Sequence, residues 1–121
     1  MPAILDETAK GTTMLEQLRV HYAFTCSDAI MADALVEQPG LFPLLREAVE
    51  PMRRDLTRFP YPKIQALQSD EGTILRVLVQ LPSGPEPPSA RMRRFKNNWW
   101  VKNCHRADAG LVFDYEIADG L

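Results

Sequence analysis

The feature that most constrains the fold is a run of strict alternation in the second half of the chain. Between residues 73 and 81 one set of alternate positions is entirely aliphatic, namely Leu75, Val77, Val79 and Leu81. The other set is mixed, namely Ile74, Arg76, Leu78 and Gln80. A period of two with one apolar set predicts a β-strand that buries one face. We therefore expect the odd-numbered face of this strand to lie against helices.

A turn sequence precedes this strand. Residues 69–72 read Ser-Asp-Glu-Gly, which suits a type I turn followed by a glycine with positive φ. Residues 64–68 come directly before the turn, so residues 64–81 are predicted to form a β-hairpin.

Two short helices are predicted near the start of the chain. Thr13 and Glu16 have the spacing of a capping box, which predicts a helix over residues 13–24. Ser27 or Asp28 can cap a second helix, and a Pro-Gly pair ends it.

The longest helical pattern covers residues 41–56. Apolar residues there keep a spacing of three and four over four turns, so this segment should be the main core helix. Pro51 lies inside it and has no N–H for the backbone ladder, so we expect a kink.

A Pro-rich segment, residues 82–88, is predicted to be a surface loop. Ser89 can cap a helix that runs to about Trp99. Residues 111–117 alternate again, which predicts a last strand with Asp114 and Glu116 outward and antiparallel pairing in the same sheet.

Together these patterns predict an α+β fold, with an N-terminal three-helix segment followed by a β-β-α-β antiparallel sheet. A length of 121 residues with 45% apolar residues suits a single domain over residues 1–121. Residues 1–12 lack a clear period and are expected to form a loose tail.

Charge is unevenly distributed, although the net charge is only −2. Residues 88–106 contain six basic residues and no acidic one, whereas the remainder has eight basic and sixteen acidic residues. The two cysteines are far apart, and the chain shows neither a secretory leader pattern nor an apolar stretch of membrane-spanning length. We therefore expect free thiols and a cytoplasmic protein that does not bind membranes.

Three segments carry a resemblance to known sequences: His-Tyr-Ala-Phe-Thr-Cys-Ser-Asp at 21–28, Glu-Ala-Val-Glu-Pro at 47–51, and Phe-Lys-Asn-Asn-Trp-Trp-Val at 95–101. From residue 13 onward the chain resembles a group of small uncharacterised bacterial proteins, common in cyanobacteria, in which paired tryptophans close a helix before a final strand. In that group acidic residues tend to precede the tryptophans, whereas residues 96–98 here are Lys-Asn-Asn. The resemblance implies the order of elements and a bacterial protein, but no activity.

Metal and thiol chemistry are two hypotheses that the sequence allows. Cys26, Cys104, His21 and His105 are zinc-ligand types, but they lack the close pairs of structural zinc sites, so no metal or cofactor is expected. Cys104 lies among basic residues, which favours a reactive thiolate and suggests a thiol-dependent enzyme. No oriented base or oxyanion-hole motif accompanies it.

The basic segment also contains aromatic residues, a combination typical of single-stranded nucleic-acid binding and of protein interfaces. Phe95 and Trp99 share a helical face with Met92 and are expected in the core, which leaves Trp100 as the exposed aromatic anchor. The predicted binding residues are Arg91, Arg93, Arg94, Lys96, Asn98, Trp100, Lys102 and Arg106.

No phosphate-binding loop, serine-nucleophile elbow or dinucleotide fingerprint occurs in the sequence. The leading hypothesis is therefore a non-enzymatic protein that acts through contact with a protein partner or with itself. Nucleic-acid binding through residues 91–106 is the alternative, although a pI near 5.6 is low for that role. A thiol enzyme at Cys104 is the third hypothesis.

Overall fold

The third strand organises the molecule, as its alternation predicts. In the computed structural model, which describes residues 13–57, 61–107 and 110–118, this strand is β3 (Gly72–Leu81). The side chains of Leu75, Val77, Val79 and Leu81 are all 0% exposed. The turn before β3 also follows the prediction, since Gly72 has a φ of 129°.

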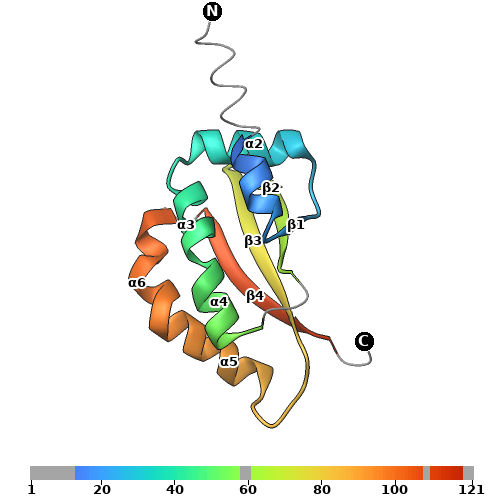
Figure 1. The fold of residues 1–121 in the computed structure, drawn as a ribbon. Coiled ribbons are helices and arrows are strands. Elements are labelled where there is room, and N and C mark those ends of the chain that lie inside the picture. Colours follow the sequence, from blue (N-terminus) through green and yellow to red (C-terminus); the bar gives the residue numbers. More distant parts are fainter. Residues whose placement is uncertain (1–12, 58–60, 108–109, 119–121) are drawn as a thin grey trace, which may run out of the picture.

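The described elements form a mixed helix and sheet structure in which helices cover one face of a four-stranded sheet (Figure 1). In chain order they are an N-terminal helix (13–19), β1 (Ala23–Phe24), α2 (Asp28–Glu37), α3 (Leu41–Glu47), α4 (Val49–Asp55), β2 (Lys63–Ser69), β3, α5 (Pro88–Phe95), the π-helical turn η1 (Lys96–Trp100), α6 (Val101–Asn103), the 3₁₀ turn η2 (Cys104–Ala107) and β4 (Leu111–Ile117). The tail predicted for residues 1–12 lies outside the described residues.

The sheet is mixed, so the prediction of an antiparallel sheet was wrong. Its order is β1-β2-β3-β4: β2 and β3 form the expected antiparallel hairpin, whereas β1 pairs parallel with β2 and β4 pairs parallel with β3. The chain between β3 and β4 includes α5, η1, α6 and η2, which return it to the start of β3. A connection of this length allows parallel pairing, which a tight hairpin cannot make.

Strand β1 was not predicted, because the sequence pattern of residues 13–24 indicated a single helix. The helix predicted for residues 13–24 ends at residue 19, and its predicted cap, Thr13, is already helical. Ala23 N–H then donates to the Pro62 carbonyl and Thr25 N–H to the Ile64 carbonyl, both at 2.9 Å. The three-helix start is therefore interrupted by a strand at the edge of the sheet.

Two helix predictions are confirmed. The Ser27 side chain caps α2 by accepting a hydrogen bond from Ile30 N–H at 3.2 Å. The long helix breaks at Ala48 into α3 and α4, because Pro51 has no N–H to donate to the Glu47 carbonyl.

The last helix differs from its prediction at both ends. Pro87, not Ser89, is the N-cap residue of α5, and the helix widens into a π-helical turn at Lys96. Strand β4 occupies the predicted residues, and Leu111 and Phe113 are buried, but Ile117 is 58% exposed where an inward position was expected.

The buried row of β3 should dominate stability. Leu75→Ala removes a fully buried side chain, so we expect the free energy of unfolding to fall by about 2–5 kcal/mol. Val36→Ala, at a position 65% exposed on α2, is the matched control and should change it by about 0.5 kcal/mol or less. Urea denaturation of both variants measures the difference, and equal losses would contradict the burial of Leu75 in the core.

Candidate functional site

Several predicted binding residues converge on the end of α4 instead of forming an open surface. Arg91 donates to the Leu56 carbonyl at 3.3 Å and to the Pro82 carbonyl. Arg94 donates to the Asp55 carbonyl at 3.3 Å and pairs with Glu86. These contacts fasten α5 to α4 and satisfy carbonyl groups where α4 ends.

Asp55 is the buried carboxylate at the centre of this contact, with 5% exposure, and the sequence did not single it out. Arg54 donates to both carboxylate oxygens, at 3.2 and 3.0 Å, while Arg94 lies 3.5 Å away and Asn98 also donates to it. The Arg54 hydrogen bonds, more than the other neighbours, hold the Asp55 pKa below its ordinary value of 3.8. Asn98 therefore serves a structural role here.

Arg106 is likewise occupied within the fold. Its guanidinium group holds both carboxylate oxygens of Glu47 at 3.0 and 2.6 Å and the Asn103 side chain at 3.0 Å. This arrangement lowers the Glu47 pKa, and it joins η2 to the end of α3.

The tryptophan pair packs against the last strand. Trp100 meets the Phe113 ring edge-on with 4.7 Å between centroids, and Trp99 stacks on Trp100 at 6.0 Å. Both tryptophans are half-buried. Trp100 is thus attached to the edge of the core, and only part of its ring is available for contact.

The remaining predicted residues are dispersed. Arg93 and Lys102 are exposed and have no acidic partner within the described part of the chain, and Lys96 is half-buried and feels the charge of Asp114. Cys104 is an exposed free thiol that donates to the Val101 carbonyl at 3.6 Å. Across residues 13–57, 61–107 and 110–118, no three His, Cys, Asp or Glu side chains gather as a metal site would require.

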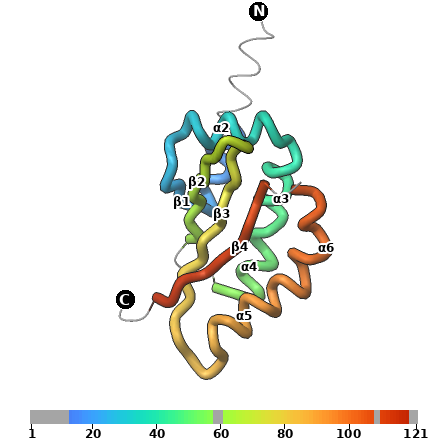
Figure 2. Tube along the Cα trace, turned by 180° about the vertical axis from the view of Figure 1, so that it is seen from behind, coloured from blue at the N-terminus to red at the C-terminus, as the bar shows by residue number. Residues whose placement is uncertain are grey.

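A different surface stands out: the face of the sheet turned away from the helices. In Figure 2 no helix lies in front of β3 and β4. Leu67 and Ile74 are direct neighbours on β2 and β3, and Val112 lies diagonally beside Ile74 on β4. They are 47%, 37% and 40% exposed, so one end of this open face presents apolar side chains to solvent.

Charged side chains occupy the middle and the other end of the open face. Arg76 donates to Asp114 at 2.7 Å and to Gln65 at 3.4 Å, and Lys63 lies 3.9 Å from Glu116. The Asp114 pKa is lowered, first by the hydrogen bond from Tyr115 N–H and then by Arg76. The basic groups come from β2 and β3, and the acidic groups from β4.

Part of this surface could be predicted from the sequence. The mixed composition of the even-numbered positions of β3 indicated a face that is not fully buried. The apolar end of this face could be recognised only from the register of the paired strands, because Leu67 and Val112 are far apart in the chain and belong to different strands.

No protein-family model, curated protein or solved structure matches this chain. No helix in the described ranges combines the length and the apolar character needed to cross a bilayer.

The Asp55 contact predicts a pH dependence. Because its pKa is lowered on folding, Asp55 stabilises the protein fully above the ordinary value of 3.8, and this contribution is lost as pH falls through the lowered pKa. Asp55→Asn should reduce the free energy of unfolding by about 1–3 kcal/mol at pH 7. The difference from the wild type should shrink as pH falls below the ordinary value of 3.8 and through the lowered pKa.

Urea denaturation at pH 7, 4 and 2 measures this difference. Glu50→Gln is the control, because the Glu50 side chain is 82% exposed and its variant should track the wild type at each pH. If the difference in the free energy of unfolding between wild type and Asp55→Asn stays constant from pH 7 to pH 2, the negative charge of Asp55 does not stabilise the fold.

Proposed function

We propose that this protein acts through protein contact, and that the open face of the sheet is its docking surface. The proposal rests on one observation: Leu67, Ile74 and Val112 lie next to one another and are exposed, on a face that no described helix covers. An apolar patch bordered by charged and amide side chains has the composition of a protein interface.

The charge pattern of the open face favours a second copy of the chain as the occupant. Lys63, Leu78 and Asp114 lie in one row across β2, β3 and β4. If two open faces pack about a two-fold axis that runs along the strands, β2 of each copy lies over β4 of the other. Lys63 then faces Asp114 of the second copy on both sides of the axis. Arg76 of β3 lies at the axis opposite Arg76 of the second copy, and each of these arginines is held by Asp114 and Gln65 of its own chain.

The same two-fold axis also brings the apolar ends of the two open faces together. Rotation about an axis along the strands keeps every residue at its own height on the sheet. The end that carries Leu67, Ile74 and Val112 therefore meets the same end of the second copy. Sheets that pack face to face commonly keep their strands within about 30° of each other, as this arrangement requires.

The other two hypotheses receive less support. Arg91, Arg94 and Arg106 are held by carbonyl or carboxylate groups of the fold, which leaves few cations for a nucleic-acid backbone. The exposed thiol of Cys104 bonds to a main-chain carbonyl. The two free thiols accord with a non-enzymatic role in the reducing cytoplasm of a bacterium. We also propose that the chain belongs to the group of small cyanobacterial-type proteins that its sequence resembles.

Self-association is tested by sedimentation equilibrium. The wild type should be a dimer at high concentration, and Leu67→Glu should weaken the dimer by roughly tenfold or more, because it puts a carboxylate into the apolar end. Val36→Glu, at a position 65% exposed on α2, is the matched control and should leave the dimer intact. A wild type that stays monomeric at the highest soluble concentration would refute this mode of contact.

A further inference from the structure

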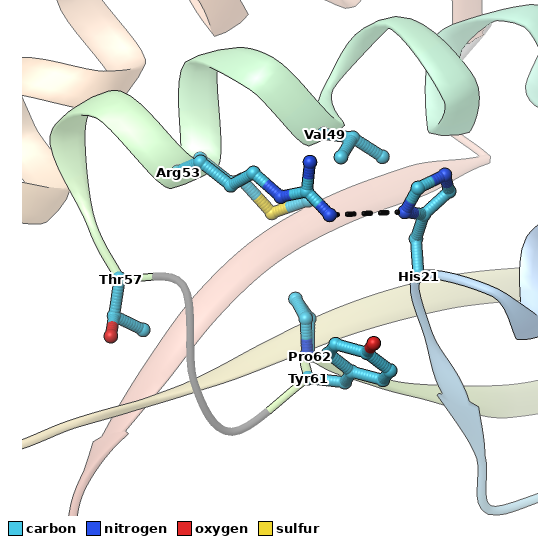
Figure 3. Close-up of a pocket in the computed structure, with 7 residues that line it drawn as sticks. His21, Val49, Arg53, Thr57, Tyr61 and Pro62 are labelled. Atoms are coloured by element: carbon cyan, nitrogen blue, oxygen red, sulfur yellow. Dashed lines mark hydrogen bonds between the residues drawn. The ribbon is translucent and has the colours of Figure 1, made fainter.

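On the helical side of the molecule, a hollow of about 350 Å³ lies between the N-terminal helix and the α3 and α4 helices. It is lined by Gln17, Val20, His21, Arg46, Val49 and Glu50. A smaller hollow of about 20 Å³ shares His21 and Val49 with it and is bordered by Arg53 (Figure 3). The larger hollow is an open depression in the surface, since four of its lining residues, Gln17, Val20, Arg46 and Glu50, are exposed.

Two arginines border these hollows, Arg46 the larger one and Arg53 the smaller one. Arg46 lies on α3 and Arg53 on α4, on either side of Ala48. Arg53 shares an ion pair with Glu50 at 3.3 Å, whereas Arg46 has no acidic partner within the described ranges.

The Arg46 guanidinium is supported without being neutralised. Its central carbon lies 5.5 Å from the centre of the Phe42 ring, a cation–π contact. A guanidinium group without an acidic partner can bind a carboxylate or phosphate in a bidentate manner.

His21 lines both hollows and contacts Arg53. Nδ1 of His21 is 3.4 Å from the Arg53 guanidinium group, which can only donate. In the tautomer that accepts this hydrogen bond at Nδ1, the ring proton is on Nε2. Figure 3 shows this second nitrogen on the side of the ring away from Arg53, where its N–H can donate to a ligand.

Apolar side chains complete the larger hollow. Val20 and Val49 form the apolar part of the lining. These two side chains would contact carbon atoms of a ligand, while Gln17 offers a polar group at the rim. The Glu50 carboxylate, also in the lining, is paired with Arg53.

We infer that this hollow binds a small organic molecule that carries a carboxylate or phosphate group. The acidic group lies against Arg46 and the Nε2–H of His21, Arg53 fixes the orientation of the imidazole, and the carbon skeleton rests on Val20 and Val49. The site is formed by the helical layer, so it is independent of docking on the open face of the sheet.

The test is a titration of the ¹⁵N-labelled full-length chain, followed by NMR, with sodium phosphate and separately with sodium succinate at constant ionic strength. The wild type should show saturable shifts at residues 17–21 and 46–50 with at least one probe, and the tighter probe identifies the preferred acidic group. Arg46→Gln should weaken binding roughly tenfold or more, because it removes charged hydrogen bonds. Arg93→Gln, an exposed arginine on α5, should bind as the wild type does.

Two results would overturn the inference. One is the absence of saturable shifts at these residues with both probes. The other is an equal affinity of Arg46→Gln and Arg93→Gln, which would mean that the anions respond to overall charge alone. Because Arg46 is exposed, the variant should stay folded, and an unchanged set of amide resonances from β3 verifies that it does.

Discussion

The structure depends on the burial of one face of β3. This strand pairs with β2 on one side and β4 on the other, and its odd-numbered side chains form the floor on which the helices pack. A side chain period of two means that its even-numbered residues must face the other way. Since the described helices lie on the odd-numbered side, the even-numbered face stays uncovered, and the proposed docking surface is a direct consequence of how the core is built.

The helical layer is held in place by buried polar contacts as well as by apolar packing. Tyr22 donates its hydroxyl to the Leu45 carbonyl at 2.5 Å and is buried, which raises its pKa. Asp55 draws Arg94 and Asn98 onto the end of α4. A concentration of basic residues in the sequence thus has a structural explanation: the arginines neutralise and cap groups of neighbouring helices, and so they are less available to a partner.

The sequence predicted the hairpin, the break near Pro51 and the residues of β4, because each depends on local chemistry: a turn with glycine, a missing N–H and strict alternation. The prediction failed where the structure depends on pairing between segments that are distant in the chain. A two-residue strand such as Ala23–Phe24 has too few residues to show a period, and its pairing with β2 depends on contacts made after folding. The direction of β4 depends on the path of the connection, which alternation does not report.

The candidate site shows the same limit. The arginines and Trp100 were recognised as chemically able to bind, but their neighbours Asp55, Glu47 and Phe113 come from other parts of the chain. The open face of the sheet and the larger hollow, lined by Arg46 and His21, are likewise assembled from separate segments, so composition along the chain could not reveal them. The polar side chains that are free to bind a partner can be identified only when the hydrogen-bond and ion-pair partners of the other polar side chains are known.

In the proposed dimer, two open faces meet with their apolar ends together. Isotope-filtered NOE spectroscopy on a mixture of ¹³C-labelled and unlabelled chains detects this contact, because only contacts between copies give a signal. We expect cross-peaks between the methyl groups of Leu67 in one copy and those of Val112 or Ile74 in the other. Intermolecular cross-peaks confined to helical residues such as Val101, or none from the sheet in a sample shown to be dimeric, would contradict it.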